Sequence, residues 1–281
     1  MLPPRDIDVT PMPNTDDSSG VAPRRRFLTS GVVGCGALAA GVALGAANSG
    51  RIERLEERIL GPRGPDREFK TTARAIWTRH NAQTREVVAR LKRKYEDAVF
   101  GRVRVWDMVE KLALCVDPTD TSLYCTSQFI HVQQLVAAME RDGVQDRDLY
   151  IAAFTHDLGK VMLLASEAPE HVVCQAAPLG GDREEIGLDN VVFQFCHPEI
   201  IYTRLKDHVP DHLAWLVRYH ATSIKHAEPY MDDRDRGYAE RYLKPFQRYD
   251  KGFKSTTFLP RIDLAKYRAL IEETFPSPIL I

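Results

Sequence analysis

Six residues of the types that bind metal ions recur on the inward faces of successive predicted helices. His220 follows Leu213, Leu216 and Val217 by seven, four and three residues, so it shares their apolar helix face. Apolar neighbours give similar inward positions to the other candidates, and a buried ionised aspartate must be paired or coordinated. The sequence therefore predicts an internal polar centre made of His131, His156, Asp157, His197, His220 and Asp250.

The number and chemistry of these candidates predict a two-metal site. Six ligands exceed the three or four that a single zinc ion takes. Imidazole and carboxylate without thiolate suit iron or manganese, and one shared carboxylate can lie between two ions. His80 is interpreted differently: it follows Trp77 and Ile76 by three and four residues and is expected to be a structural core histidine.

Helical periodicity accounts for most of the chain that must position this centre. A loop is expected at 117–121, which is rich in Asp, Pro and Thr. No run shows sustained strand alternation, and no internal repeat is present, so the sequence predicts an all-α fold. The predicted helices cover 71–92, 105–114, 129–139, 149–164, 191–206, 211–219, 238–249 and 264–275.

Composition and charge exclude several classes of protein. The chain has 281 residues, 38 basic and 39 acidic, with 44 % hydrophobic and 27 % charged residues. These values are ordinary for a globular protein with a proper core, and the balance of charge argues against nucleic-acid binding. No cysteine spacing gives a CxxC pair, which argues against a zinc ribbon or a disulfide framework. Buried free thiols are expected for Cys35, Cys115, Cys125, Cys174 and Cys196.

The N-terminal part of the sequence differs from the rest. Residues 1–23 have the composition of a disordered leader. In 24–50, Arg24-Arg25-Arg26 precedes an uncharged stretch rich in Gly and Ala, which resembles a twin-arginine export signal; a membrane anchor is the alternative. We interpret 51–66 as a linker and 67–281 as the folded domain. Export out of the cytoplasm is favoured, and a membrane-anchored or a cytoplasmic protein remains an alternative.

Short motifs around the predicted ligands resemble a known family. Thr-His-Asp-Leu-Gly-Lys at 155–160 looks like the His-Asp pair of the HD-domain superfamily, whose members are mostly helical metal-dependent phosphohydrolases. Further segments resemble one branch, the myo-inositol oxygenases, in order and spacing from Gln83 to the C-terminus. They are Gly-Leu-Asp-Asn-Val at 187–191, Cys-His-Pro-Glu at 196–199, Arg-Tyr-His at 218–220 and Phe-Gln-Arg-Tyr-Asp at 246–250.

The resemblance implies an HD-domain-like helical bundle around a dinuclear metal site. It implies two iron ions in a mixed-valent Fe2+/Fe3+ state, with dioxygen as co-substrate and Asp157 as the bridging carboxylate. The iron ligands it implies are His131, His156, Asp157, His197, His220 and Asp250. Lys160 matches a catalytic lysine that contacts substrate, Lys254 matches a second substrate lysine, and either Asp117 or Asp120 matches a substrate-binding acid.

Two substrate-contacting positions depart from the family pattern. Gln175 stands where the family has an aspartate that binds substrate hydroxyls, and Ala221 stands where it has a serine. The implied function is a non-haem di-iron oxygenase acting on inositol, a related cyclitol or a small diol. We expect a monomer whose partners are this small molecule and, through the N-terminal segment, the export machinery.

Two other classes of function remain as alternatives. A phosphohydrolase would use the same metal ions to activate water and would need cationic residues for phosphate, for which Lys160 and Lys254 are candidates. A non-catalytic helical module would keep the fold and lose ligands. Retention of all six ligand-type residues argues against this last class.

Overall fold

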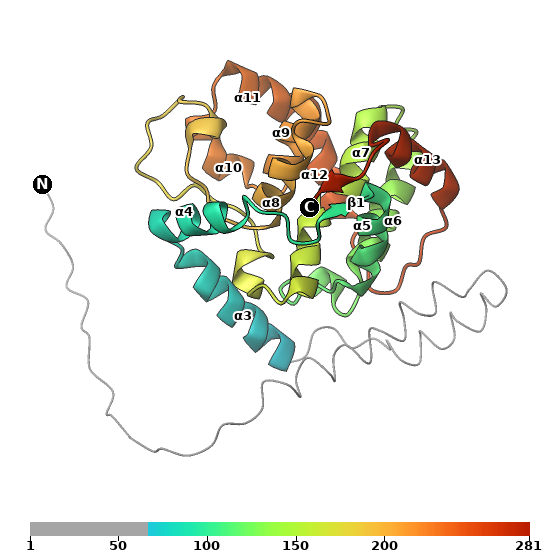
Figure 1. Cartoon of the computed structure of the whole chain (residues 1–281), viewed down its shortest axis with the longest axis horizontal. Helices are drawn as coiled ribbons and strands as arrows, with labels where there is room; N and C mark the ends of the chain where they lie inside the picture. The colour runs from blue at the N-terminus through green and yellow to red at the C-terminus, as the bar shows by residue number, and fades with distance from the viewer. Residues whose placement is uncertain (1–66) are drawn as a thin grey trace, which may run out of the picture.

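Residues 67–281 are described by the computed structural model, and they form a helical fold (Figure 1). The predicted leader 1–23, the signal-like segment 24–50 and the linker 51–66 lie outside the described residues. The α-helices are α3 (Arg67–Asn81), α4 (Arg85–Lys94), α5 (Val105–Lys111), α6 (Gln128–Arg141), α7 (Arg147–Thr155), α8 (His197–Leu205), α9 (Asp211–Tyr219), α10 (Ile224–Ala227), α11 (Asp233–Tyr238), α12 (Lys244–Gly252) and α13 (Leu264–Thr274).

Shorter elements connect these helices. The 3₁₀-helices are η1 (Leu112–Leu114), η2 (Thr121–Leu123), η3 (Leu158–Ala165), η4 (Pro169–His171), η5 (Leu188–Asn190) and η6 (Glu228–Tyr230), and η7 (Ala239–Leu243) is a π-helix. Strands β1 (Arg102–Val103) and β2 (Ile279–Leu280) pair antiparallel and tie the C-terminal residues to the segment before α5. The predicted all-α class is confirmed. Within residues 67–281, no helix combines the length and the apolar character needed to cross a bilayer.

The predicted helix 71–92 is wrong as a single element, because α3 and α4 are separate helices. Thr84 caps α4: its side chain accepts a hydrogen bond from the Val87 backbone N–H. The buried Gln83 lies between the two helices, and its amide donates to the carbonyls of Glu170 and Phe195. A new cap and a buried side-chain amide therefore end one helix and start the next.

The predicted helix 191–206 is also wrong at its start, because α8 begins only at His197. The preceding residues pair with an earlier segment through a bridge between Pro178 and Phe193. Pro198 lies in the first turn of α8, where its missing N–H costs no helical hydrogen bond. His197 is buried as predicted, but Phe193 does not share its helix.

The predicted helix 149–164 changes type in its middle. The α-helix α7 ends at Thr155, and the 3₁₀-helix η3 begins at Leu158, so His156 and Asp157 occupy the junction. The expectation that Lys160 lies one α-helical turn after His156 is therefore wrong in its geometry. Lys160 is nevertheless only 5 % exposed, so it is a buried lysine and not a solvated surface residue.

The helices that carry the predicted ligands pack directly on one another. Helix α8 contacts α9 and η3, α7 contacts α6 and α9, and α12 contacts α6. Fully buried side chains such as Phe154, Leu135 and Phe246 fill the space between them. Burial of each of these side chains stabilises the folded state by on the order of 1.5–3 kcal/mol. The same core therefore fixes the relative positions of all the ligand-bearing elements.

The described cysteines agree with the predicted buried thiols in three of four positions. Cys115, Cys174 and Cys196 are buried free thiols, and Cys125 is half-buried. Cys35 lies outside the described residues. Burial raises the pKa of the Cys115 thiol to about 12, so that thiol stays protonated at neutral pH.

Gly159 brings η3 into direct contact with the start of α8. A Cβ atom at this position would lie 2.2 Å from the backbone carbonyl oxygen of His197 and 2.8 Å from its Cα atom. No heavy atoms can approach so closely, and the obstacle is backbone, which cannot rotate away. Glycine is thus required here, since it lets His197 approach the Asp157 segment.

Replacing this glycine tests the close approach. We expect Gly159→Ala to lower the free energy of unfolding by about 1–3 kcal/mol, because α8 must move away from η3. Urea-induced unfolding measures this change. The matched control is Gly237→Ala in α11, where an added Cβ meets nothing within 4 Å and should be neutral or stabilising by about 0.5–1 kcal/mol. A Gly159→Ala protein as stable as the wild type would contradict the packing.

Candidate metal centre

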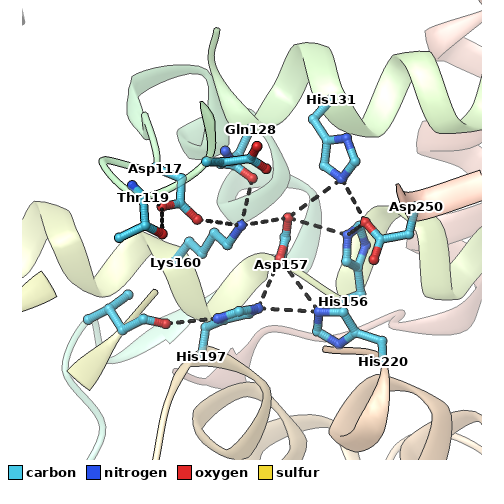
Figure 2. Close-up of polar contacts among 12 residues, drawn as sticks. Asp117, Thr119, Gln128, His131, His156, Asp157, Lys160, His197, His220 and Asp250 are labelled. Carbon is cyan, nitrogen blue, oxygen red and sulfur yellow. Dashed lines mark hydrogen bonds and ion pairs between the residues drawn. The ribbon is translucent and has the colours of Figure 1, made fainter. Parts of the chain in front are cut away.

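Five parts of the chain bring the six predicted ligands together (Figure 2). One histidine comes from α6, and a His-Asp pair comes from the junction of α7 and η3. Another histidine starts α8, the next directly follows α9, and the second aspartate lies in α12. All are buried, with exposures of 6 % or less: His131, His156, Asp157, His197, His220 and Asp250.

Asp157 lies at the middle of the cluster, with one carboxylate oxygen turned to each side. Its Oδ1 lies 3.1 Å from His197 Nε2 and 3.6 Å from His220 Nε2. Its Oδ2 lies 3.3 Å from His156 Nε2 and 3.9 Å from His131 Nε2. The carboxylate is therefore shared between two pairs of imidazoles, as Figure 2 shows.

Asp250 completes only one of the two sides. Its Oδ1 lies 3.0 Å from His131 Nε2 and 3.7 Å from His156 Nε2. The two sets of nitrogen and oxygen ligands are therefore unequal: one has two histidines and two aspartates, and the other has two histidines and Asp157 alone. The second set leaves more coordination positions for another ligand.

Backbone carbonyls fix the orientation of three of the rings. A carbonyl can only accept, so the Nδ1–H of His156 donates to Ala153 at 2.9 Å. In the same way, His197 donates to Val172 at 2.8 Å and His220 to Val217 at 2.8 Å. With Nδ1–H donating to a carbonyl, each ring turns its Nε2 to the centre, which is the arrangement that metal-binding histidines adopt.

This arrangement fits metal ions and is unfavourable without them. His197 Nε2 and His220 Nε2 lie 3.2 Å apart with their lone pairs facing each other. His156 Nε2 is a buried atom with no hydrogen-bond partner. Two groups, His131–His156–Asp157 and Asp157–His197–His220, each have ligand atoms within 4.8 Å of one another. A cation in each group would remove these conflicts, and nitrogen with oxygen ligands suits iron or manganese.

The protonation states agree with this role. Burial lowers the pKa of His197, and it lowers the pKa of His220 to about 4, so both rings are neutral at neutral pH. Burial alone would raise the pKa of Asp157, but the charges of His156 and Lys160 hold it well below its usual value. The centre thus offers neutral imidazoles at His197 and His220 beside an ionised carboxylate.

An ion-pair network joins α8 to α9 beside this centre. Arg218 contacts both carboxylate oxygens of Glu199, at 2.8 Å and 3.1 Å, and lies 2.7 Å from Asp189. A two-point arginine–carboxylate contact has a defined geometry. The motifs at 187–191, 196–199 and 218–220 therefore hold together the segments that carry His197 and His220.

Lys160 lies beside the centre and uses all three of its N–H donors. Its Nζ is 3.2 Å from Asp157, 3.1 Å from Asp117 and 2.9 Å from the side-chain oxygen of Gln128. Of the two acids that the sequence left open, Asp117 is the one that pairs with Lys160. The fully buried Gln128 was missed, because a glutamine at the start of a helix carries no spacing signal for a buried ammonium.

A cavity of about 280 Å³ opens onto the centre. Lys254 lies at its wall and pairs with Asp120 at 2.7 Å. Sequence reasoning missed Trp77, Thr119 and Lys251 as lining residues, since none belongs to a motif. The predicted substrate residues all line this cavity: Asp117, Lys160, Gln175, Ala221 and Lys254.

His80 has the structural role that the sequence indicates. It is fully buried, and its Nε2 lies 2.9 Å from the Gln175 carbonyl. Its Nδ1 lies 2.9 Å from the Glu170 carbonyl, so both ring nitrogens face backbone carbonyl oxygens. His80 therefore fixes the backbone of a cavity-lining residue.

Comparisons with known proteins agree with this geometry. A family model described as myo-inositol oxygenase matches residues 70–183. A probable inositol oxygenase of Oryza sativa subsp. japonica is 27 % identical over 243 residues, covering 71 % of this chain and 77 % of that protein. Inositol oxygenase of Danio rerio is 24 % identical over 238 residues, covering 70 % of this chain and 84 % of that protein. The chain is therefore similar to the myo-inositol oxygenase family.

The similar proteins are named as inositol oxygenases, and this chain has a candidate metal centre. The family model spans His131, His156, Asp157 and Lys160, whereas His197, His220 and Asp250 lie beyond it. Those last three meet the first group in space, at distances of 3.0–3.6 Å. The tertiary structure therefore joins ligands from both parts of the chain.

The shared carboxylate predicts a specific effect on metal content. In Asp157→Asn the side chain keeps its size but loses its charge, so two cations would face each other with no anion between them. We expect less than the wild-type amount of metal per chain, measured by elemental analysis, with an unchanged circular dichroism spectrum. The control is Asp235→Asn, a buried aspartate that bonds Trp215 and Leu188 outside the centre. Full metal content in Asp157→Asn would exclude a bridging role.

Proposed function

We propose that the protein is a non-haem di-iron oxygenase that cleaves a carbon–carbon bond in inositol, a related cyclitol or a small diol. The observation that carries this proposal is the carboxylate of Asp157, shared between two imidazole pairs where a cavity opens. Relatives named inositol oxygenase support the reaction type. The proposed iron ligands are those of the candidate centre, and the proposed cofactor is a mixed-valent iron pair with dioxygen as co-substrate.

The proposed reaction balances without an external reductant. For inositol it is C6H12O6 + O2 → C6H10O7 + H2O. The bond between two hydroxyl-bearing carbons breaks, and one carbon becomes an aldehyde while the other becomes a carboxylic acid. Dioxygen takes up the electrons, with one oxygen atom entering the product and the other leaving as water. The metal pair, when bound, would supply coordination sites for these oxygens and exchange electrons with them.

Lys160 holds positive charge where a substrate oxygen would lose its proton. Burial opposes the ammonium form, but the charges of Asp157 and Asp117 raise the pKa of Lys160 above its usual value. It therefore remains protonated at neutral pH and can stabilise negative charge on a substrate oxygen next to Asp157. Since all three donors are engaged, Lys160 must share one of them with the substrate.

The walls of the cavity limit both its contents and its access to water. Its volume of about 280 Å³ lies near the lower limit of small-molecule sites and suits a small polyol better than a bulky cofactor. Buried side chains form the inner end, including Asp157, His197 and His220. Exclusion of water from that end protects a reactive oxidant from side reactions.

The proposed function is tested by dioxygen consumption of the iron-loaded protein. The panel contains inositol, other cyclitols and small diols, with and without an acidic substituent, and phosphate esters. We expect one dioxygen per acid formed, and a kcat lower by about 100-fold in Lys160→Gln, since a charged donor is lost at the developing oxyanion. The matched control is Lys206→Gln, an exposed lysine in the segment after α8.

The same panel decides between the proposed function and its alternative. Hydrolysis of phosphate esters, with no dioxygen consumed on any polyol, would contradict the oxygenase and support the phosphohydrolase. Dioxygen consumption that is equal in wild type and Lys160→Gln would leave the oxygenase in place and exclude the role of Lys160.

A further inference from the structure

The cavity above the centre is lined by several ammonium groups. Three lysines line it, Lys160, Lys251 and Lys254, each with three N–H donors. Lys160 is fully satisfied by its contacts with Asp117, Asp157 and Gln128. The remaining two lysines therefore decide which chemistry the outer part of the cavity can bind.

The two acids of the outer cavity are already occupied. Asp117 Oδ1 accepts from the Thr119 backbone N–H at 2.8 Å and from its hydroxyl at 2.7 Å, and Oδ2 faces Lys160. Asp120 Oδ1 accepts from the Ser122 backbone N–H at 2.9 Å, and Oδ2 accepts from Lys254 at 2.7 Å. Neither carboxylate offers a free negative charge to a substrate.

The two outer lysines retain unused donors. Lys254 has one acceptor, Asp120, so two of its N–H groups remain. Lys251 lies one residue after Asp250 and, within the described part of the chain, has no hydrogen bond or ion pair. The neighbouring lining residues Gln175 and Ala221 carry no charge, and Gln175 adds two amide donors.

We propose that Lys251, with Lys254, forms a subsite for an oxyanion, so that the substrate is a small polyhydroxylated molecule bearing a carboxylate or a phosphate. This inference rests on the proposed function and narrows its substrate class. An oxyanion supplies acceptors for the unused N–H groups of Lys251 and Lys254. A charged acceptor forms stronger hydrogen bonds with ammonium groups than a hydroxyl does. The hydroxyl groups of the same molecule then face Lys160 and the metal centre.

Binding without turnover measures this preference. Isothermal titration calorimetry under anaerobic conditions compares three cyclohexane polyols: inositol, inositol monophosphate and quinate, which carries a carboxylate. Both the metal-loaded and the metal-free protein are titrated, since the lysines do not depend on metal. We expect at least one of the two anions to bind about tenfold or more tightly than inositol, as a charged hydrogen bond allows. The advantage should shrink as salt is added.

A variant separates the charge from other effects. Lys251→Met keeps much of the apolar side chain and removes the ammonium group, so it should abolish most of the preference for the anion over inositol. Lys251→Arg should restore the preference. The matched control is Lys225→Met, an exposed lysine in α10 away from the cavity.

Each outcome decides one of the two claims. A preference for phosphate over carboxylate, or the reverse, identifies which oxyanion the subsite takes. Equal affinity for inositol and both anions, or a preference that persists in Lys251→Met, overturns the subsite. An anion that binds through Lys251 but supports no dioxygen consumption leaves the subsite in place and contradicts the oxygenase. Efficient turnover of inositol with no preference for the anion leaves the oxygenase in place and overturns the subsite.

Discussion

The buried carboxylate of Asp157 is the constraint on which the rest of the structure depends. An ionised carboxylate removed from water costs several kcal/mol unless opposite charges surround it. On the protein side Lys160, at 3.2 Å, supplies one such charge. The four neighbouring imidazoles place ring nitrogens on its two sides, where they can bind cations. The position of Asp157 thus explains both the buried ammonium group and the pairing of histidines on its two sides.

The scaffold holds this arrangement through backbone contacts and helix ends. His156 and Asp157 lie at a change of helix type, and His197 lies at the start of α8, so short segments can direct their side chains inward. Gly159 allows the two segments to touch. The Gln247 amide donates to the carbonyls of His220 and Thr222 at 2.7 Å and 2.8 Å, which fixes the end of α9. The inner centre is therefore rigid, whereas the outer cavity wall, with Gln175 and Lys251, is where specificity can vary.

The sequence was sufficient to predict the inner centre, because apolar neighbours at helical spacing mark a buried ligand. This signal identified His220 through Leu213 and Leu216, and the motif at 155–160 identified the central aspartate. It could not place the start of α8, which depends on the bridge between Pro178 and Phe193, nor the cap at Thr84 that divides the first predicted helix. Lys251 and Gln128 were missed because their roles follow from unused or shared hydrogen-bond donors, which only the three-dimensional arrangement reveals.

Anomalous X-ray diffraction from crystals of the iron-loaded protein, recorded on both sides of the iron absorption edge, tests the central claim most directly. The account predicts two anomalous peaks, one between Asp157 and the His131–His156 pair, the other between Asp157 and the His197–His220 pair. Each peak should contact a different oxygen of Asp157. A single peak, or two peaks of which only one contacts the Asp157 carboxylate, would contradict the account.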